Sequence, residues 1–331
     1  IDAAGGQMLV VTIEGRDLQP GEQIAIEYGV GSVGAAVDRF AERDSKLWIA
    51  VDGDGDGVRK ILPDSPGVEI VAGPPSRLHL ALPAVARTGE TVSLTIAVLD
   101  AVGNAGPLFE GDVVLENVGS SVDMPESVTL TTGDQARTIA KVTPLEGGVV
   151  RIRATVGEAL SAESNPMRVG SDGPKVFWAD LHGHSGQSDG TGTPEDYFSY
   201  ARDVAGLDIA VLTDHDHWGV DFLDESKGMW KAIVDQVEIF HEPGRFVTLF
   251  GYEWTSWLHG HRHVLYFDKG GEVFSSIDPR YDTPLELWKA LEGKKAMTIA
   301  HHSGGGPIAT NWDFEPDEIL ETVTEVVSVH G

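Results

Sequence analysis

Residues 176–184 (VFWADLHGH) and 207–217 (LDIAVLTDHDH) decide the fold of the second half of the chain. Each stretch begins with a short apolar run and ends in histidines and aspartates. The apolar runs predict buried strands, and a helix is predicted between them because Thr193 and Pro194 are typical of an N-cap and a first helical position, with Gly206 as its stop. Strand–helix alternation is typical of a mostly parallel sheet, whose loops meet at the carboxyl ends of the strands. We therefore expect the polar ends of these strands to lie together.

The same alternation continues towards residue 331. It predicts further helices within 228–241 and from Thr283, and further strands at 246–252, 264–267, 296–300 and 325–329. Histidines or carboxylates follow five separate strands, far more than chance placement would give. These groups are Asp180, His182 and His184; Asp214, His215, Asp216 and His217; Glu253; His301 and His302; and His330.

Residues 1–170 differ sharply in composition from the rest. They hold one of the 12 histidines (His79) and one of the 8 tryptophans (Trp48). Period-two alternation broken by Gly, Pro, Asn and Asp favours antiparallel β-sandwich modules. A Gly-Pro-Pro break at 73–75 divides this part into modules 1–72 and 73–170, ahead of an α/β domain at 171–331. The strands expected are 8–14, 23–28, 46–51, 91–99, 112–116, 127–130 and 149–156.

The net charge is −28, from 24 basic and 52 acidic residues, and both parts of the chain are acidic. This charge excludes a broad surface for a nucleic-acid duplex. No apolar run reaches the roughly 18 residues of a membrane span. Cysteine is absent, which removes disulfides and thiolate ligands. β-Modules ahead of an acidic, cysteine-free domain favour an extracytoplasmic (periplasmic or secreted) protein, and the oligomeric state is not indicated.

The run DGDGDG at 52–57 imitates the first half of an EF-hand loop, with Asp52, Asp54 and Asp56 as candidate Ca²⁺ ligands. The imitation fails at the twelfth position, where Pro63 replaces the glutamate. Two readings stay open, a solvated hairpin turn and a weak calcium site.

The histidines of the second half point to a different metal. His182 and His184 are two residues apart, so in extended backbone both imidazoles can face one ion. His263 lies at the edge of its strand and is the best candidate of its group, whereas His259 and His261 fit an exposed histidine-rich loop. Imidazoles and carboxylates without thiolates suit Zn²⁺, Mn²⁺ or Fe²⁺.

Residues 180–216 (DLHGHSGQSDGTGTPEDYFSYARDVAGLDIAVLTDHD) resemble the opening of the PHP (polymerase and histidinol phosphatase) superfamily. GYEW, HVLYF and IAHH resemble its later motifs in the correct order, so the resemblance covers residues 176–331. The β-rich front half looks like the accessory region of a larger PHP-related family. The resemblance implies a distorted (β/α) barrel with two to three divalent ions.

Carried over position by position, the resemblance assigns His182 and His184 to a first metal. It makes Glu253 the bridge to a second metal, completed by His263 and His301. Asp189 and His215 would hold a third. His302 stands where the family usually has proline, and the closing Asp-x-His motif is not in this chain.

The resemblance implies hydrolysis of a small-molecule phosphomonoester or phosphodiester by metal-activated water. Two alternatives remain: hydrolysis of another ester or an amide, and a degenerate barrel that binds a glycan or surface. Arg262 is a candidate phosphate clamp, or else an arginine of a mobile loop. The other candidates are His217 and His302 as general acids or hydrogen-bond partners of the ligands, and Trp218, Trp254 and Trp257 as a wall for an organic group or as core.

Residues 171–331 number 161, fewer than the roughly 200–250 of a full barrel. We therefore expect this domain to be incomplete at its C-terminal side, without the closing strands. On that expectation the third metal position lacks a ligand and is weakly occupied, and His330 faces the site.

Overall fold

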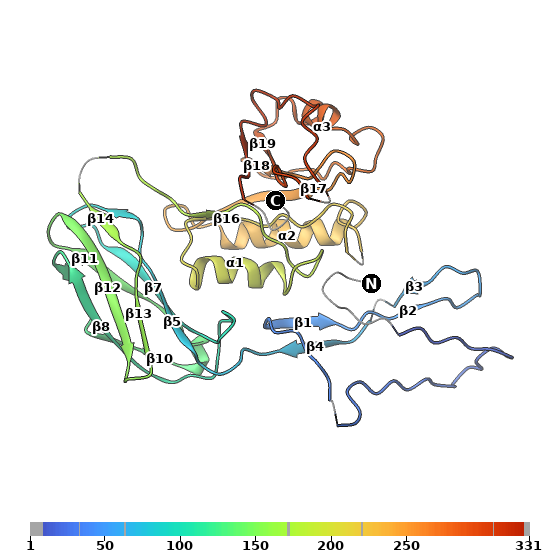
Figure 1. The fold of residues 1–331 in the computed structure, drawn as a ribbon, viewed down its shortest axis with the longest axis horizontal. Coiled ribbons are helices and arrows are strands. Elements are labelled where there is room, and N and C mark those ends of the chain that lie inside the picture. The colour runs from blue at the N-terminus through green and yellow to red at the C-terminus, as the bar shows by residue number, and fades with distance from the viewer. Residues whose placement is uncertain are drawn as a thin grey trace. The chain divides into compact units, whose positions relative to one another are not determined.

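The computed structural model describes residues 9–32, 34–62, 64–170, 173–219, 221–306 and 308–327. The chain divides into two units, residues 1–38 and 39–331. The second unit holds all of the described helices and strands (Figure 1).

The described part of residues 1–72 does not form the sandwich module that the alternation predicts. No strand occurs at 9–14 or 23–28, and residue 8 lies outside the described residues. Alternation builds a sheet only when a second apolar face covers it, and here Ile24 and Ile26 are exposed. The strand expected at 46–51 is split between two small antiparallel sheets. These sheets pair β1 (Glu42–Lys46) with β4 (Gly67–Ile70), and β2 (Ala50–Val51) with β3 (Lys60–Ile61).

Residues 77–169 form two sheets around one core, as predicted for the second module. One sheet has the order β10-β8-β12-β14-β6, with β13 also paired to β12, and the other has the order β5-β7-β11-β9. Their strands are β5 (Arg77–Ala81), β6 (Val85–Ala86), β7 (Val92–Leu99), β8 (Gly111–Gly119), β9 (Val122–Asp123), β10 (Ser127–Leu130), β11 (Arg137–Pro144), β12 (Gly148–Val156), β13 (Leu160–Glu163) and β14 (Met167–Val169), with a short 3-10 helix at Thr132–Asp134.

Strand β12 shows why the sequence forms this sandwich. Val150, Ile152 and Ala154 are fully buried on one face. Arg151 and Arg153, on the opposite face, form ion pairs with glutamates of neighbouring strands. One face apolar and the other charged is the pattern of a sheet that packs on a core.

The histidine-rich half contains a six-stranded mixed sheet with the order β15-β16-β17-β18-β19-β20. Neighbours are parallel except on both sides of β18. The predicted helices and all of the predicted strands except 325–329 are therefore found, but the sheet is less parallel than expected. The elements are β15 (Ala179–Asp180), α1 (Pro194–Asp203), β16 (Ile209–Val211), α2 (Lys227–Phe240), β17 (Val247–Trp254), β18 (Arg262–Tyr266), α3 (Pro284–Leu291), β19 (Ala296–Ala300) and β20 (Val323–Thr324).

The reversal at β18 follows from the length of its connection. Only residues 255–261 join β17 to β18, whereas a parallel crossover takes a dozen residues or more. The amino end of β18 consequently lies beside the carboxyl end of β17, with Glu253 paired to His263. This arrangement brings residues before β18 to the edge where the other strands end.

Local capping explains the two helices with sequence signals. Thr193 and Thr283 each accept a bond from the backbone N–H three residues later and complete a capping box, with proline at the first helical position. Helices α1 and α2 contact one another, and α2 packs on β17 (Figure 1). Their buried side chains, including Phe198, Ile233 and Val237, form the outer core of the sheet.

The sheet curls so that its two outer strands approach each other at one end. Val211, Leu265 and Ile299 form a second apolar cluster, with Leu181 against them. His182, just after β15, hydrogen bonds through Nδ1 to Glu325 Oε2, just after β20, at 2.9 Å. The last strand is β20 rather than the expected 325–329; residues 325–327 are not strand, and 328–331 lie outside the described residues.

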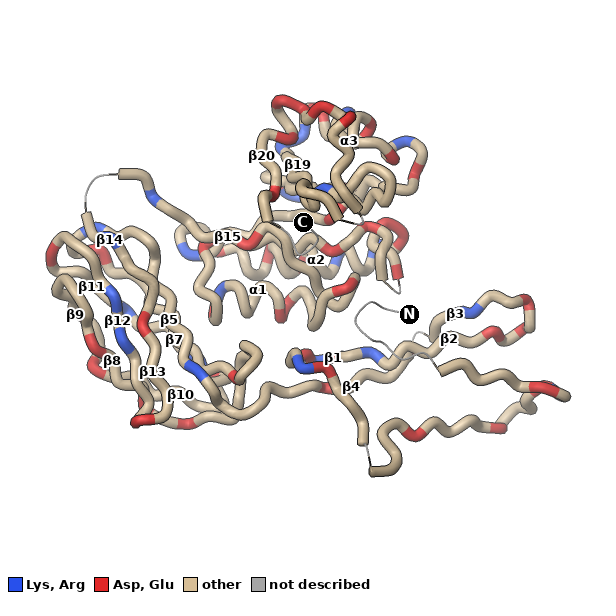
Figure 2. Tube along the Cα trace, in the orientation of Figure 1, with Lys and Arg blue, Asp and Glu red and all other residues tan. Residues whose placement is uncertain are grey.

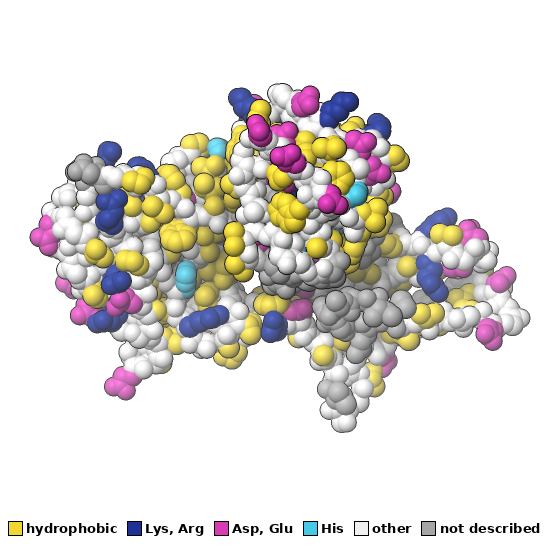
Figure 3. Space-filling view, turned by 45° about the horizontal axis from the view of Figure 1, so that its top comes forward, with side chains coloured by type: hydrophobic (Ala, Val, Ile, Leu, Met, Phe, Trp, Pro, Cys, Tyr) yellow, Lys and Arg dark blue, Asp and Glu magenta, His cyan; other side chains and the backbone are white. Residues whose placement is uncertain are grey.

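Acidic residues are distributed over both the sandwich and the histidine-rich part (Figure 2). On the face drawn in Figure 3, hydrophobic atoms are interspersed with polar and charged ones. None of the helices in the described ranges combines the length and hydrophobicity that crossing a bilayer requires.

Candidate metal centre

Glu253 lies at the centre of a ring of imidazoles. Its side chain is about 1% exposed, and both carboxylate oxygens face histidine nitrogens. The nitrogen–oxygen distances are 3.7 Å for His182, 3.0 Å for His184, 3.2 Å for His215, 2.6 Å for His261, 3.7 Å for His263 and 3.0 Å for His301. The expectation that these strand ends converge is therefore correct.

The six histidines reach Glu253 from four parts of the sheet. His182 and His184 follow β15, His215 follows β16 and His301 follows β19. His261 and His263 come from the amino end of β18, which the antiparallel pairing places at the same edge. The loops of an α/β sheet are expected to converge at the carboxyl ends of its strands.

The loop that carries His182 and His184 is held tightly. A Cβ on Gly183 would lie 2.3 Å from the Tyr197 ring, so only glycine fits there. Asp214 fixes the turn that follows His184, because its carboxylate accepts hydrogen bonds from Ser185 N at 2.8 Å and Ser188 Oγ at 2.6 Å. The first aspartate of the DHDH run is therefore a structural residue.

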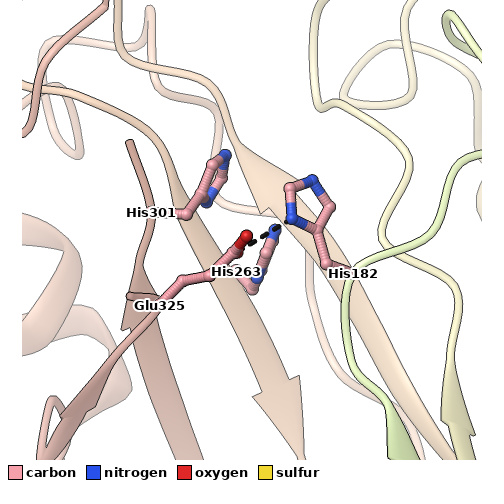
Figure 4. A group of neighbouring side chains, drawn as sticks. All are labelled: His182, His263, His301 and Glu325. Carbon is pink, nitrogen blue, oxygen red and sulfur yellow. Dashed lines mark hydrogen bonds and ion pairs between the residues drawn. The ribbon is translucent and has the colours of Figure 1, made fainter. Parts of the chain in front are cut away.

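One group of side chains offers four ligand atoms for a single ion. His182, His263, His301 and Glu325 place one ligand atom each within 4.8 Å of the others, and Figure 4 shows these side chains pointing toward one another. The rings of His263 and His301 are stacked with centroids 4.2 Å apart. Glu325 supplies the only carboxylate of this group.

Within the described residues, three further groups lie beside the first. His184, Asp189 and His215 form a second group, in which His184 Nδ1 lies 2.8 Å from Asp189 Oδ1. The Asp189 side chain is 49% exposed, so this group faces solvent. Two further groups include the central glutamate, one with His182 and His184, the other with His261, His301 and His302.

Burial and neighbouring charges oppose each other in this centre. Burial favours the neutral acid of Glu253, but the nearby imidazoles of His215 and His184 outweigh it and hold its pKa well below the usual range. Burial also disfavours the charged form of His184, yet the neighbouring carboxylates of Asp189 and Glu253 raise its pKa to about 10. Burial lowers the pKa of His263 and of His301. These two imidazoles are thus neutral at pH 7, the form that binds metal.

Several buried polar atoms here have no hydrogen bond to any described residue. They include Glu253 Oε2, His261 Nδ1 and Nε2, His263 Nε2 and His301 Nδ1. His261 Nδ1 is close to the Glu253 carboxylate but lacks the geometry of a hydrogen bond. Buried polar atoms without partners are costly and rare. Ligand atoms that lie within 4.8 Å of one another, several of them without a hydrogen bond, fit a divalent cation.

The structure brings together all seven predicted metal ligands: His182, His184, Asp189, His215, Glu253, His263 and His301. Sequence reasoning missed Glu325, because the strand was expected to begin rather than end beside it. It also placed His261 in an exposed loop, whereas this residue is 2% exposed and lies against Glu253. The short connection between β17 and β18 could have indicated the position of His261, because it implies that β18 runs antiparallel to β17.

Arg262 is not a phosphate clamp or a mobile-loop arginine. It is 0% exposed and pairs through Nε with Glu321 Oε2 at 2.8 Å. Strand alternation directs it away from the face of His263. Its guanidinium lies near the Trp254 and Trp288 rings.

The remaining candidates differ in where they lie. His302 belongs to a metal group and has a left-handed backbone, φ 58°. His217 lies outside the described groups and bonds to Asp216 Oδ1 and Ser276 Oγ, so it supports neighbouring loops. Trp254 is core, with its indole N–H donated to Tyr281 O. His330 lies outside the described residues.

The exposed aspartates of the DGDGDG turn form a separate group that could hold a cation. Their carboxylates already accept backbone bonds, such as Gly55 N to Asp52 Oδ1 at 2.7 Å and Val58 N to Asp56 Oδ1 at 2.7 Å. These bonds are those of an Asx-type turn.

Comparison with known proteins gives a partial match. A family model described as "Protein of unknown function (DUF3604)" matches residues 212–306. An uncharacterized protein of Chlamydia pneumoniae is 24% identical over 95% of this chain and 52% of its own length. The chain thus spans about half the length of that curated relative.

Similarity to solved structures is low. A β-glucuronidase of glycoside hydrolase family 2 is 17% identical over 34% of this chain and 14% of its own, with a TM-score of 0.28. A cycloisomaltooligosaccharide glucanotransferase of Paenibacillus sp. is 12% identical over 55% of this chain and 28% of its own, with a TM-score of 0.30. Such TM-scores do not indicate a shared fold.

Proposed function

We propose that this protein is a metal-dependent hydrolase of small-molecule phosphoesters, with a PHP-like site at the edge of its mixed sheet. The central observation is the buried carboxylate of Glu253 inside six imidazoles. A buried carboxylate of this kind needs cations around it, and the ligand set suits Zn²⁺, Mn²⁺ or Fe²⁺.

The ligand groups suggest how two or three ions would be held. One ion fits His182, His263, His301 and Glu325, and another fits the solvent-facing group of His184, Asp189 and His215. When bound, such ions activate water at neutral pH and neutralise charge on phosphoryl oxygens.

The protein's own residues orient and expose this centre. Thr255 Oγ1 lies 2.8 Å from His215 Nδ1, which fixes the imidazole ring. Exposed Asp189 marks the side from which a small substrate can enter, whereas Glu253, His263 and His301 are sealed from solvent. A substrate therefore meets the ions from one side, with its anionic group toward them.

The test is hydrolysis of p-nitrophenyl phosphate and bis-p-nitrophenyl phosphate by the protein after removal of metal and reloading with Mn²⁺ or Zn²⁺. We expect activity on at least one ester that is lost with chelator and restored by metal. A loaded protein that binds metal but cleaves neither ester contradicts the phosphoester assignment. A protein that binds no metal contradicts the hydrolase as a whole.

A further inference from the structure

Two tryptophans stand beside the metal centre with much of their surface in solvent. Trp218 follows the DHDH run and is 37% exposed, and Trp257 in the β17–β18 connection is 47% exposed. Their ring centroids are 4.8 Å apart at an interplanar angle of 31°. Together they form one aromatic surface, here called the indole pair.

The indole pair touches the metal centre directly. The Trp218 ring lies 5.9 Å from that of His215, and the Trp257 ring lies 5.9 Å from that of His261. Both imidazoles are themselves buried, at 7% and 2% exposure. The indoles therefore form a solvent-facing layer over this edge of the centre.

Core packing does not account for this placement. Trp254 and Trp288 of the same domain are 0% and 4% exposed, and each donates its indole N–H to a protein oxygen. Neither indole N–H of the pair bonds to any residue in the described ranges, so both stay available to a ligand. A half-exposed aromatic ring with an available donor is typical of a binding surface.

We infer that the indole pair binds an aromatic ring in the organic part of the substrate, while the phosphoryl group faces the ions. This inference rests on the proposed phosphoester function. Aromatic rings pair in offset or edge-on geometry at centroid distances of about 4.5–7 Å. The two rings of the indole pair are arranged in this way, and their exposed side can pair with a further ring. The substrate class is therefore an aryl or heteroaryl phosphoester rather than an acyclic one.

The test compares phenylphosphonate with methylphosphonate, which share an anionic head and are not hydrolysed, by calorimetry on the Mn²⁺-loaded protein. Stacking on an aromatic side chain strengthens binding by about 5- to 150-fold, so we expect phenylphosphonate to bind at least about fivefold more tightly. Trp218→Leu and Trp257→Leu should each reduce this preference to below about threefold, whereas Trp218→Phe keeps a ring and should retain most of it.

The matched control is Trp178→Leu. This tryptophan is 56% exposed and precedes β15, at the opposite end of that strand from His182, so its loss should leave the preference unchanged. Equal affinity for both phosphonates in the wild type, or full preference in both leucine variants, overturns the inference alone. Binding of neither phosphonate contradicts the phosphoester function and the inference with it.

Discussion

Glu253 is the residue on which the proposed chemistry of this protein depends. Removing a carboxylate from water costs several kcal/mol unless opposite charges compensate it. In the metal-free protein the protonated His184 supplies part of that charge, whereas burial keeps His263 and His301 neutral. On the proposed function, divalent ions between Glu253 and the surrounding nitrogens would supply the remaining positive charge.

Glu253→Gln tests this reasoning because it keeps the shape and removes the charge. We expect the rate of hydrolysis to fall by at least about 100-fold. Even the loss of a residue that only hydrogen bonds to a metal ligand reduces activity by about 10–100-fold. The far-ultraviolet circular dichroism spectrum should be unchanged. Glu272→Gln is the control, because that glutamate is exposed and its ion pair within the described residues is with Lys294, at 3.0 Å. Wild-type activity in Glu253→Gln would remove this residue from the mechanism.

The buried ion pair of Arg262 with Glu321 leads to a prediction about stability rather than activity. Their side chains are 0% and 2% exposed, so Glu321→Gln leaves the guanidinium buried without a counter-charge. We expect a loss of about 3–5 kcal/mol in the free energy of unfolding, measured with urea. The double variant Arg262→Met with Glu321→Leu should recover most of that loss. A stable Glu321→Gln protein with weaker substrate binding would instead restore the phosphate-clamp role of Arg262.

At the scale of elements, the turn after β15 sets the spacing of His182 and His184. Gly183→Ala would drive a methyl group into the Tyr197 ring, and the ring is held by its hydroxyl bond to Val211 O at 2.8 Å. We expect metal affinity to fall by at least about tenfold because both ligands shift. Gly228→Ala in α2 is the control, since its Cβ would meet nothing closer than 3.8 Å. Equal affinities, measured by competition with a chelating dye, would show that the turn does not position the ligands.

The elements with strong local signals could be predicted from the sequence. Thr193 and Thr283 mark the starts of their helices, because their capping hydrogen bonds are made within one turn and depend on no distant contact. The direction of β18 could not be derived from its own residues, because pairing depends on the length of the preceding connection and on the partner strand. That one unknown explains why His261 was misplaced. Ile24 and Ile26 show the opposite error, alternation without a covering sheet.

The site was predictable to the extent that it follows strand ends. His182, His215, Glu253 and His301 were identified because loops converge at the carboxyl edge of a sheet. Arg262 was misjudged because its buried partner, Glu321, lies 59 residues away and nothing local marks the pair. Glu325 was missed for a boundary error of a few residues, which is the least reliable part of any prediction from sequence.

At the scale of the whole molecule, proton and metal binding are linked. In the metal-free protein the raised pKa of His184, about 10, adds stability that is complete below its unfolded value of 6.5. That contribution is lost as the pH rises through about 10. A metal ion that binds the His184 imidazole must displace its proton. The apparent metal affinity should therefore increase from pH 6 to pH 9.

Calorimetry in two buffers with different ionisation enthalpies checks this linkage. The observed enthalpy of Mn²⁺ binding should differ between the buffers, because protons are released. His241→Gln is the control, since that residue lies outside the described metal groups and the pH dependence should persist. An affinity that is constant or falls between pH 6 and pH 9 would contradict the proton assigned to His184.

Anomalous diffraction from crystals grown with Zn²⁺ tests the account most directly, because it locates the ions themselves. We predict at least two peaks, one about 2.0–2.2 Å from nitrogens of His182, His263 and His301 and another beside His184 and His215. Glu253 should contact at least one of them. Crystals that hold no zinc among these side chains, or hold it only at exposed acidic turns such as 52–57, would contradict the metal centre.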